Sequence, residues 1–182
     1  EYSLSTNTDI YLYDLASGQT RNITEGMGGY DTHPRFSPDG KRISWISMER
    51  DGYEADLKRL FVQDLKTGQK TFLTDGFEYD VDELQWAANS QSLFFLSTKH
   101  AEAQLWEIAL KGRKIRQITT GMHDYTSLDV QGDKILAGRQ SYIEPTDLYL
   151  VDIKTGAAKQ LTAENKSTLD DLAPISVEKR WV

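Results

Sequence analysis

The sequence predicts an all-β protein made of repeated four-stranded antiparallel units, and three observations support this. Hydrophobic residues alternate with polar ones at a period of two, as in half-buried strands. Turn residues bound each alternating segment. The chain also repeats itself at a fixed offset of 50 residues, and the matched pairs are Asp14 with Asp64, Leu15 with Leu65, Gly18 with Gly68, Gln19 with Gln69, Thr24 with Thr74, Gly26 with Gly76, and Ser47 with Ser97.

Four copies of the repeat end in a Leu-Thr or Ile-Thr pair, and the steps between their threonines are 50, 45 and 43 residues; the threonines are Thr24, Thr74, Thr119 and Thr162. These periods are typical of a propeller blade and too long for leucine-rich or ankyrin repeats. The predicted fold class is therefore all-β, a partial β-propeller of about three and a half four-stranded antiparallel blades.

The strands follow in a constant order within each repeat. In the first complete one, a strand at 34–36 enters the turn Ser37-Pro38-Asp39-Gly40, where proline and Asp-Gly favour a tight hairpin. Strands at 42–47, 60–65 and 70–74 follow. The next two repeats predict strands at 84–86, 93–97, 105–110 and 115–119, then at 127–130, 135–138, 148–153 and 159–162.

This pattern divides the chain into five ranges. Residues 1–26 supply the last two strands of a preceding blade, and blades span 27–76, 77–121 and 122–164. Residues 165–182 are expected to be an exit segment. Because three and a half blades cannot close a ring, strand edges stay bare, and we expect the isolated chain to be marginally stable or to self-associate through them. Light scattering tests this, since a robust monodisperse monomer would contradict it.

Composition excludes several classes of function. The net charge is −7 and disfavours a nucleic-acid or anionic-membrane surface. The chain contains no cysteine, so it has neither disulfides nor thiolate metal sites, and no cofactor is expected. A cysteine-free chain fits the cytosol and the bacterial periplasm equally, and we favour an exported or periplasmic location. The opening at Glu1 suggests a segment of a longer protein.

Local motifs add a family resemblance. The turn Ser37-Pro38-Asp39-Gly40-Lys41, the Asp-Leu-x-x-Gly hairpins and the Leu/Ile-Thr strand ends resemble the TolB-type propeller repeat, which occurs in the TolB protein and in prolyl-oligopeptidase-family serine peptidases. Residues 47–56 look like a segment of the acylaminoacyl-peptidase and dipeptidyl-peptidase branch. Residues 174–182 are similar to the strand by which such propellers pass into an α/β-hydrolase domain.

The resemblance implies that catalysis takes place outside these residues. In that family the Ser-Asp-His triad lies on the hydrolase domain, with serine in Gly-x-Ser-x-Gly, a motif that this sequence lacks. We therefore assign no catalytic residue here. The resemblance implies a parent serine peptidase whose propeller caps the active site and selects short peptides by their amino end. The implied partners are the missing blades, the hydrolase domain and a short peptide.

Residues 48–58 form the candidate site, because they lengthen the connection between two strands and long loops on rigid scaffolds often carry function. Glu49, Glu54 and Asp56 are candidates to bind a peptide ammonium group, and Arg50 a carbonyl or carboxylate. Tyr53 is a candidate to pack over a substrate side chain or to anchor the loop. The alternative for all five is a solvated charged loop or an interdomain contact.

Two other groups are weaker candidates. Asp80, Asp82 and Glu83 are close in sequence, as calcium ligands are, but an acidic solvated loop explains them more simply. His33 could contact a ligand on the same face as the loop, or make a structural hydrogen bond. The aromatic side chains that fall on strands are expected to pack between blades: Trp45, Trp86, Phe95 and Trp106.

Two further functions stay open. One is a TolB-like module that binds a protein partner without enzymatic activity, and the other is a structural propeller in a multidomain surface protein. Fold alone does not choose among them.

Overall fold

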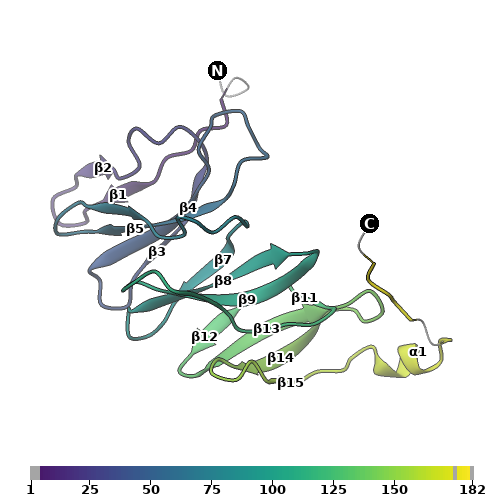
Figure 1. Ribbon diagram of the computed structural model, residues 1–182. Helices are drawn as coiled ribbons and strands as arrows, with labels where there is room; N and C mark the ends of the chain where they lie inside the picture. The colour runs from purple at the N-terminus through teal and green to yellow at the C-terminus, as the bar shows by residue number, and fades with distance from the viewer. Residues whose placement is uncertain (1–4, 174–175, 181–182) are drawn as a thin grey trace.

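The computed structural model describes residues 5–173 and 176–180, and it is almost entirely β. Figure 1 shows the sheets following one another across the molecule in sequence order. This is a partial propeller, as the repeat predicts. No helix of the described residues is long and apolar enough to span a membrane.

The first two sheets come from the N-terminal part of the chain. The first holds two strands, β1 (Tyr11–Tyr13) and β2 (Thr20–Asn22). The second has four antiparallel strands in sequence order, β3 (Asp31–Phe36), β4 (Arg42–Ser47), β5 (Arg59–Asp64) and β6 (Lys70–Phe72).

The third sheet repeats this order with β7 (Asp82–Trp86), β8 (Ser92–Lys99), β9 (Glu102–Ala109) and β10 (Ile115–Gln117). The fourth contains β11 (Asp124–Tyr125), β12 (Asp129–Gln131), β13 (Lys134–Gln140), β14 (Asp147–Asp152) and β15 (Ala158–Gln160). Both β11 and β12 pair with β13, so two short pieces replace the predicted strand at 127–130. The blade boundaries themselves stay a prediction.

Side chains that alternate along the strands build a separate core in each space between neighbouring sheets. On β8, Leu93 and Phe95 face the second sheet, whereas Phe94 and Leu96 face the fourth. A third core joins the first sheet to the second and includes Trp45. The four aromatic side chains predicted to pack between blades are all buried in these cores: Trp45, Trp86, Phe95 and Trp106.

The repeated threonine has the same structural role in every sheet. Its hydroxyl accepts a hydrogen bond from a backbone N–H fourteen residues earlier, in or just before the next-to-last strand of the sheet: Ile10 to Thr24 (2.9 Å), Leu60 to Thr74 (3.0 Å), Leu105 to Thr119 (3.0 Å) and Leu148 to Thr162 (2.9 Å). The first three threonines are buried, where an unpaired N–H would be costly. The motif therefore extends the pairing of the last two strands of each sheet beyond the end of the last strand.

Because the strands are antiparallel, their connections emerge on two opposite faces. We call the face that carries the β4–β5, β6–β7 and β8–β9 connections the upper face; the β1–β2, β3–β4 and β5–β6 turns lie on the lower face. The chain leaves β15 on the upper face and continues into a short helix, α1 (Lys166–Asp170), which the sequence did not predict. Of the expected exit strand, residues 174–175 and 181–182 lie outside the described residues, and 176–180 have no regular structure.

Candidate functional site

Three of the five predicted site residues contact one another inside the β4–β5 loop. The Arg50 backbone N–H donates to Asp56 Oδ2 at 2.7 Å, and its guanidinium pairs with Asp56 Oδ1 at 2.5 Å. The guanidinium carbon also lies 4.0 Å from the centre of the Tyr53 ring. Hydrogen bonds from Arg50 hold the pKa of Asp56 below its usual value. These contacts fix the shape of the loop, which is the role of a loop anchor.

Other contacts fasten this loop to its surroundings. Glu49 forms an ion pair with Arg59 on β5 at 3.4 Å. The Asp51 carboxylate accepts hydrogen bonds from the backbone N–H groups of Thr6 (2.6 Å) and Asn7 (3.2 Å), which lower the pKa of Asp51. The loop is therefore tied both to its own sheet and to the chain before β1.

Glu54 differs from the other four, because it lines a pocket of about 440 Å³ on the upper face. The pocket lies between the second and third sheets. Its lining residues come from β3 and the residue before it, from β4, the loop and β7: Tyr30, Thr32, His33, Ile46, Met48, Glu54, Lys58, Asp82 and Glu83. Glu49, Arg50, Tyr53 and Asp56 do not line it. Of the five predicted residues, one thus lines the pocket, and the other four shape the loop or hold it in place.

His33 and Glu83 enter this pocket at equivalent positions of two neighbouring sheets. Each interrupts the pairing of the first strand of its sheet, between Thr32 and Arg35 and between Asp82 and Leu84. Both have positive φ angles, 55° and 43°. Such backbone is strained for residues with a side chain, and bulges redirect side chains beside binding sites. The offset of 50 residues is the sequence signal that could have singled out this pair.

The pocket carries negative charge that is only partly compensated. Lys58 Nζ pairs with Asp82 Oδ1 at 2.7 Å, and the Lys58 backbone N–H donates to Asp80 at 2.8 Å. The bond with Asp82 raises the pKa of Lys58. Among the described residues, neither Glu54 nor Glu83 has an ion-pair partner. Two carboxylates thus remain available to a cationic ligand.

Two of the acidic residues near β7 are bonded to a lysine. Asp80 and Asp82 both bind Lys58, as described above. Within residues 5–173 and 176–180, no cluster of three or more histidine or acidic side chains has the arrangement of a metal site.

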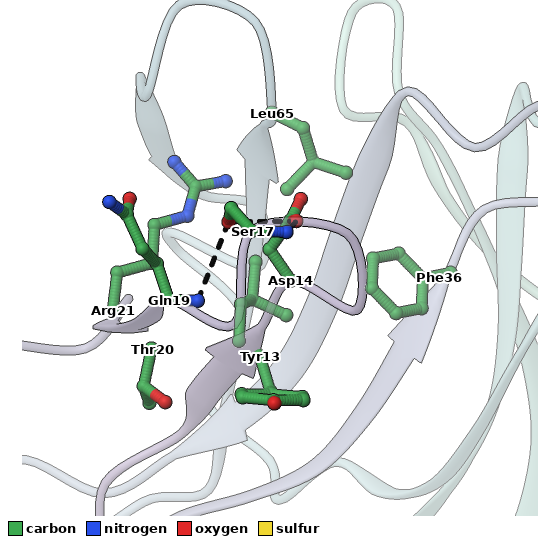
Figure 2. Close-up of a pocket in the computed structure, with 9 residues that line it drawn as sticks. Tyr13, Asp14, Ser17, Gln19, Thr20, Arg21, Phe36 and Leu65 are labelled. Carbon is green, nitrogen blue, oxygen red and sulfur yellow. Dashed lines mark hydrogen bonds between the residues drawn. The ribbon is translucent and has the colours of Figure 1, made fainter.

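Another pocket, of about 450 Å³, lies on the lower face between the β1–β2 turn and the second sheet. Figure 2 shows Tyr13 at the end of β1 and Asp14 and Ser17 in the turn that follows, with Phe36 and Leu65 nearby. A groove of the same kind recurs one repeat later, where Val62, Asp64, Gln69 and Thr71 take the places of Leu12, Asp14, Gln19 and Arg21. Since it accompanies sheet stacking, we do not take this pocket as the functional site.

Comparison with known proteins identifies the family. Residues 3–177 match the PD40 model, described as the TolB beta propeller domain, so the chain belongs to the TolB-type β-propeller family. It is 61% identical over 181 residues to dipeptidyl-peptidase 5 of Porphyromonas gingivalis, and 56% identical over 182 residues to dipeptidyl-peptidase 5 of Porphyromonas endodontalis. In both cases the whole chain aligns but spans only 26% of the relative.

Solved structures show the same fold. The acylaminoacyl peptidase of Pyrococcus horikoshii superposes on 91% of this chain with a TM-score of 0.71 and 21% identity, over 24% of its own length. TolB from Acinetobacter baumannii covers 85% with a TM-score of 0.62 and 22% identity, over 37% of its own length. Propellers of peptidases and of TolB thus share this stack of sheets.

Proposed function

We propose that this chain is the non-catalytic propeller part of a serine peptidase that removes dipeptides from short peptides. The names of its relatives, dipeptidyl-peptidase 5, support this assignment. In this proposal an α/β-hydrolase domain carries the catalytic triad and sits over the upper face. The chain leaves β15 on that face, where the β4–β5 loop and the pocket with Glu54 also lie. A propeller in that position would exclude water and folded proteins from the active site.

The uncompensated carboxylates in the upper pocket are the observation that carries the second part of the proposal. A peptide with a free amino end brings an ammonium group, which Glu54 and Glu83 bind through charge-assisted hydrogen bonds. Ile46 and Met48 provide an apolar wall beside them. In this proposal Arg50 and Asp56 hold the loop in the shape that presents Glu54, and Tyr53 takes the loop-anchor role that the sequence left open for it. Direct contact of these residues with a substrate stays a prediction.

Kinetics of the full-length protein test this site. We expect Glu54→Gln and Glu83→Gln each to lower kcat/KM for dipeptide substrates with a free amino end by about 10- to 100-fold, since a hydrogen bond to a charged group contributes about 1.5–3 kcal/mol. Glu78→Gln is the matched control, because Glu78 is an exposed carboxylate on the same face outside the pocket. Wild-type kinetics in both pocket variants would refute binding of the amino end here.

The family also supports a second candidate, a TolB-like propeller that binds a protein partner and has no catalytic domain. The match to the TolB family model favours it. The sequence after Val182 in the gene distinguishes the two. A hydrolase domain with a Gly-x-Ser-x-Gly motif supports the peptidase, and its absence supports the binding module.

A further inference from the structure

Two connections of the upper face are bonded to each other beside the upper pocket. The backbone N–H of Lys58, the last residue before β5, donates to Asp80 Oδ1 at 2.8 Å. In the opposite direction, the Val81 N–H donates to the Lys58 carbonyl at 2.9 Å. Lys58 ends the β4–β5 loop and Asp80 belongs to the β6–β7 connection, so these bonds hold the second sheet against the third.

The two carboxylates proposed to bind the amino end are close to this bond along the chain. Glu54 precedes Lys58 by four residues, and Glu83 follows Asp80 by three. Because Glu54 and Glu83 enter the pocket from different sheets, the separation between them depends on how the sheets are held together. One ammonium group can bind both carboxylates at once only if that separation fits it. The Lys58–Asp80 bond lies where it can set the separation.

The next pair of sheets contains the same bond. There the Ala103 backbone N–H donates to Asp124 Oδ1, also at 2.8 Å. Lys58 and Ala103 are matched positions of the repeat, since each lies two residues before a leucine whose N–H binds the repeated threonine. Asp80 and Asp124 are both half-buried. The bond is therefore a feature of the repeat, and Asp124 provides a structural reference for Asp80.

The ion pair of Lys58 with Asp82 spans the same two sheets but is a weaker connection. It is exposed, with 42% and 43% of the two side chains accessible, and ion pairs of this kind contribute little to stability. A carboxylate that accepts a bond from a backbone N–H forms a stronger, charge-assisted contact. Unlike Lys58 and Asp82, Asp80 does not line the pocket, so its replacement leaves the lining side chains as they are.

We propose that Asp80 is a positioning residue, which holds Glu54 and Glu83 at the separation that an ammonium group requires. This inference rests on the proposed function, because it assumes that the two carboxylates bind the amino end of a peptide. It adds that their spacing is set by a side chain outside the pocket.

Kinetics of the full-length protein with peptide substrates that have a free amino end test this role. We expect Asp80→Ala to lower kcat/KM by about 5- to 50-fold, mainly through a higher KM, because a displaced binding group loses affinity. Asp80→Asn keeps an oxygen acceptor for the Lys58 N–H but removes the charge, so we expect a loss below about threefold. Asp124→Ala is the matched control, which removes the same bond one repeat later and should leave kcat/KM unchanged.

Combination with Glu54→Gln separates positioning from a merely structural role. When one carboxylate is left, the separation no longer matters, so Asp80→Ala in that background should change kcat/KM less than about twofold. An equal loss in both backgrounds would overturn the role of Asp80. So would wild-type kinetics of Asp80→Ala, or equal losses in Asp80→Ala and either Asp80→Asn or Asp124→Ala.

These outcomes concern Asp80 alone and leave the proposed function standing, provided that Glu54→Gln or Glu83→Gln weakens catalysis. Wild-type kinetics of both glutamine variants would overturn the proposed function and the role of Asp80 together. Melting temperatures verify folding, and we expect Asp80→Ala and Asp124→Ala to lower them similarly. If Asp80→Ala does not fold, Asp80→Ser replaces it with the same expected kinetics, because its hydroxyl oxygen lies one bond closer to its own backbone than Oδ1 does.

Discussion

Asp31 is a buried carboxyl at the joint between the first and second sheets. It is 3% exposed; its Oδ1 accepts a hydrogen bond from Trp45 Nε1 at 3.1 Å, and its Oδ2 has no partner among the described residues. One repeat later the same two positions hold Val81 and Phe95, which are apolar and fully buried. The packing of the second sheet against the third thus contains no such polar pair. Burial raises the pKa of Asp31.

The raised pKa gives a pH dependence of definite sign. The folded state favours the protonated carboxyl, so the ionised form costs stability as pH rises through the unfolded and then the folded pKa. We expect Asp31→Asn, which still accepts the bond from Trp45, to raise the free energy of unfolding by about 1–2 kcal/mol at pH 7. At pH 3 the gain should largely vanish.

Urea denaturation at the two pH values measures this effect in the full-length protein. Glu25→Gln, at an exposed carboxylate, serves as the control and should change stability little at either pH. A variant that is less stable than wild type at pH 7 would show that the charged Asp31 is stabilising, against the expectation.

Among the elements, two turns of the same sequence have different surroundings: the turn between β5 and β6 and the turn between β14 and β15. Gly68 and Gly156 occupy the same Lys-Thr-Gly turn and have the same φ angle, 74°. A Cβ on Gly68 would meet only the end of the Gln63 side chain, at 3.8 Å. A Cβ on Gly156 would overlap the carbonyl oxygen of Ile118 in the third sheet.

The two glycines therefore form a matched pair for substitution by alanine. We expect Gly68→Ala to lower the free energy of unfolding by about 1–2 kcal/mol, because alanine is strained in the left-handed backbone conformation. Gly156→Ala has the same backbone strain, and its Cβ must also displace the backbone at Ile118. We therefore expect it to lower the free energy of unfolding by about 3 kcal/mol or more. Chemical denaturation of both variants gives the difference, and equal losses would show that the fourth sheet shifts freely against the third.

Regular strands follow from the sequence more directly than the loops that join them. The strand at 42–47 was predicted with the bounds that β4 has, because alternating side chains and a Pro-Asp-Gly turn define it locally. The β4–β5 loop was predicted too, but not its internal pairing of Arg50 with Asp56. Such a pairing depends on the path of an irregular backbone. The periodic patterns that predict strands give no information about that path.

For the site, the sequence offered Glu54 in the loop and His33 and Glu83 as weaker candidates, but it did not show that the three line one pocket. His33 and Glu83 reach the pocket because bulges interrupt β3 and β7, and because two sheets that are 50 residues apart lie side by side. The strand pattern alone gives no sign of a bulge. A search for polar residues at matching repeat positions would have found the pair.

At the scale of the whole molecule, exposure at matched repeat positions shows where neighbours are needed. Leu105 and Ile118 are buried against the fourth sheet, whereas their counterparts Leu148 and Leu161 are 42% and 49% exposed. At the other end, one edge of β1 pairs with no strand among the described residues. A stack of sheets leaves such surfaces at both ends. Self-association through them remains a proposal, as does their pairing with further blades.

Binding of a peptide's amino end in the upper pocket is tested most directly by a structure of the full-length protein with a bound peptide. We predict the peptide nitrogen within about 3.2 Å of a carboxylate oxygen of Glu54 or Glu83, the distance of a charge-assisted hydrogen bond. A peptide whose amino end lies away from both carboxylates would contradict the claim.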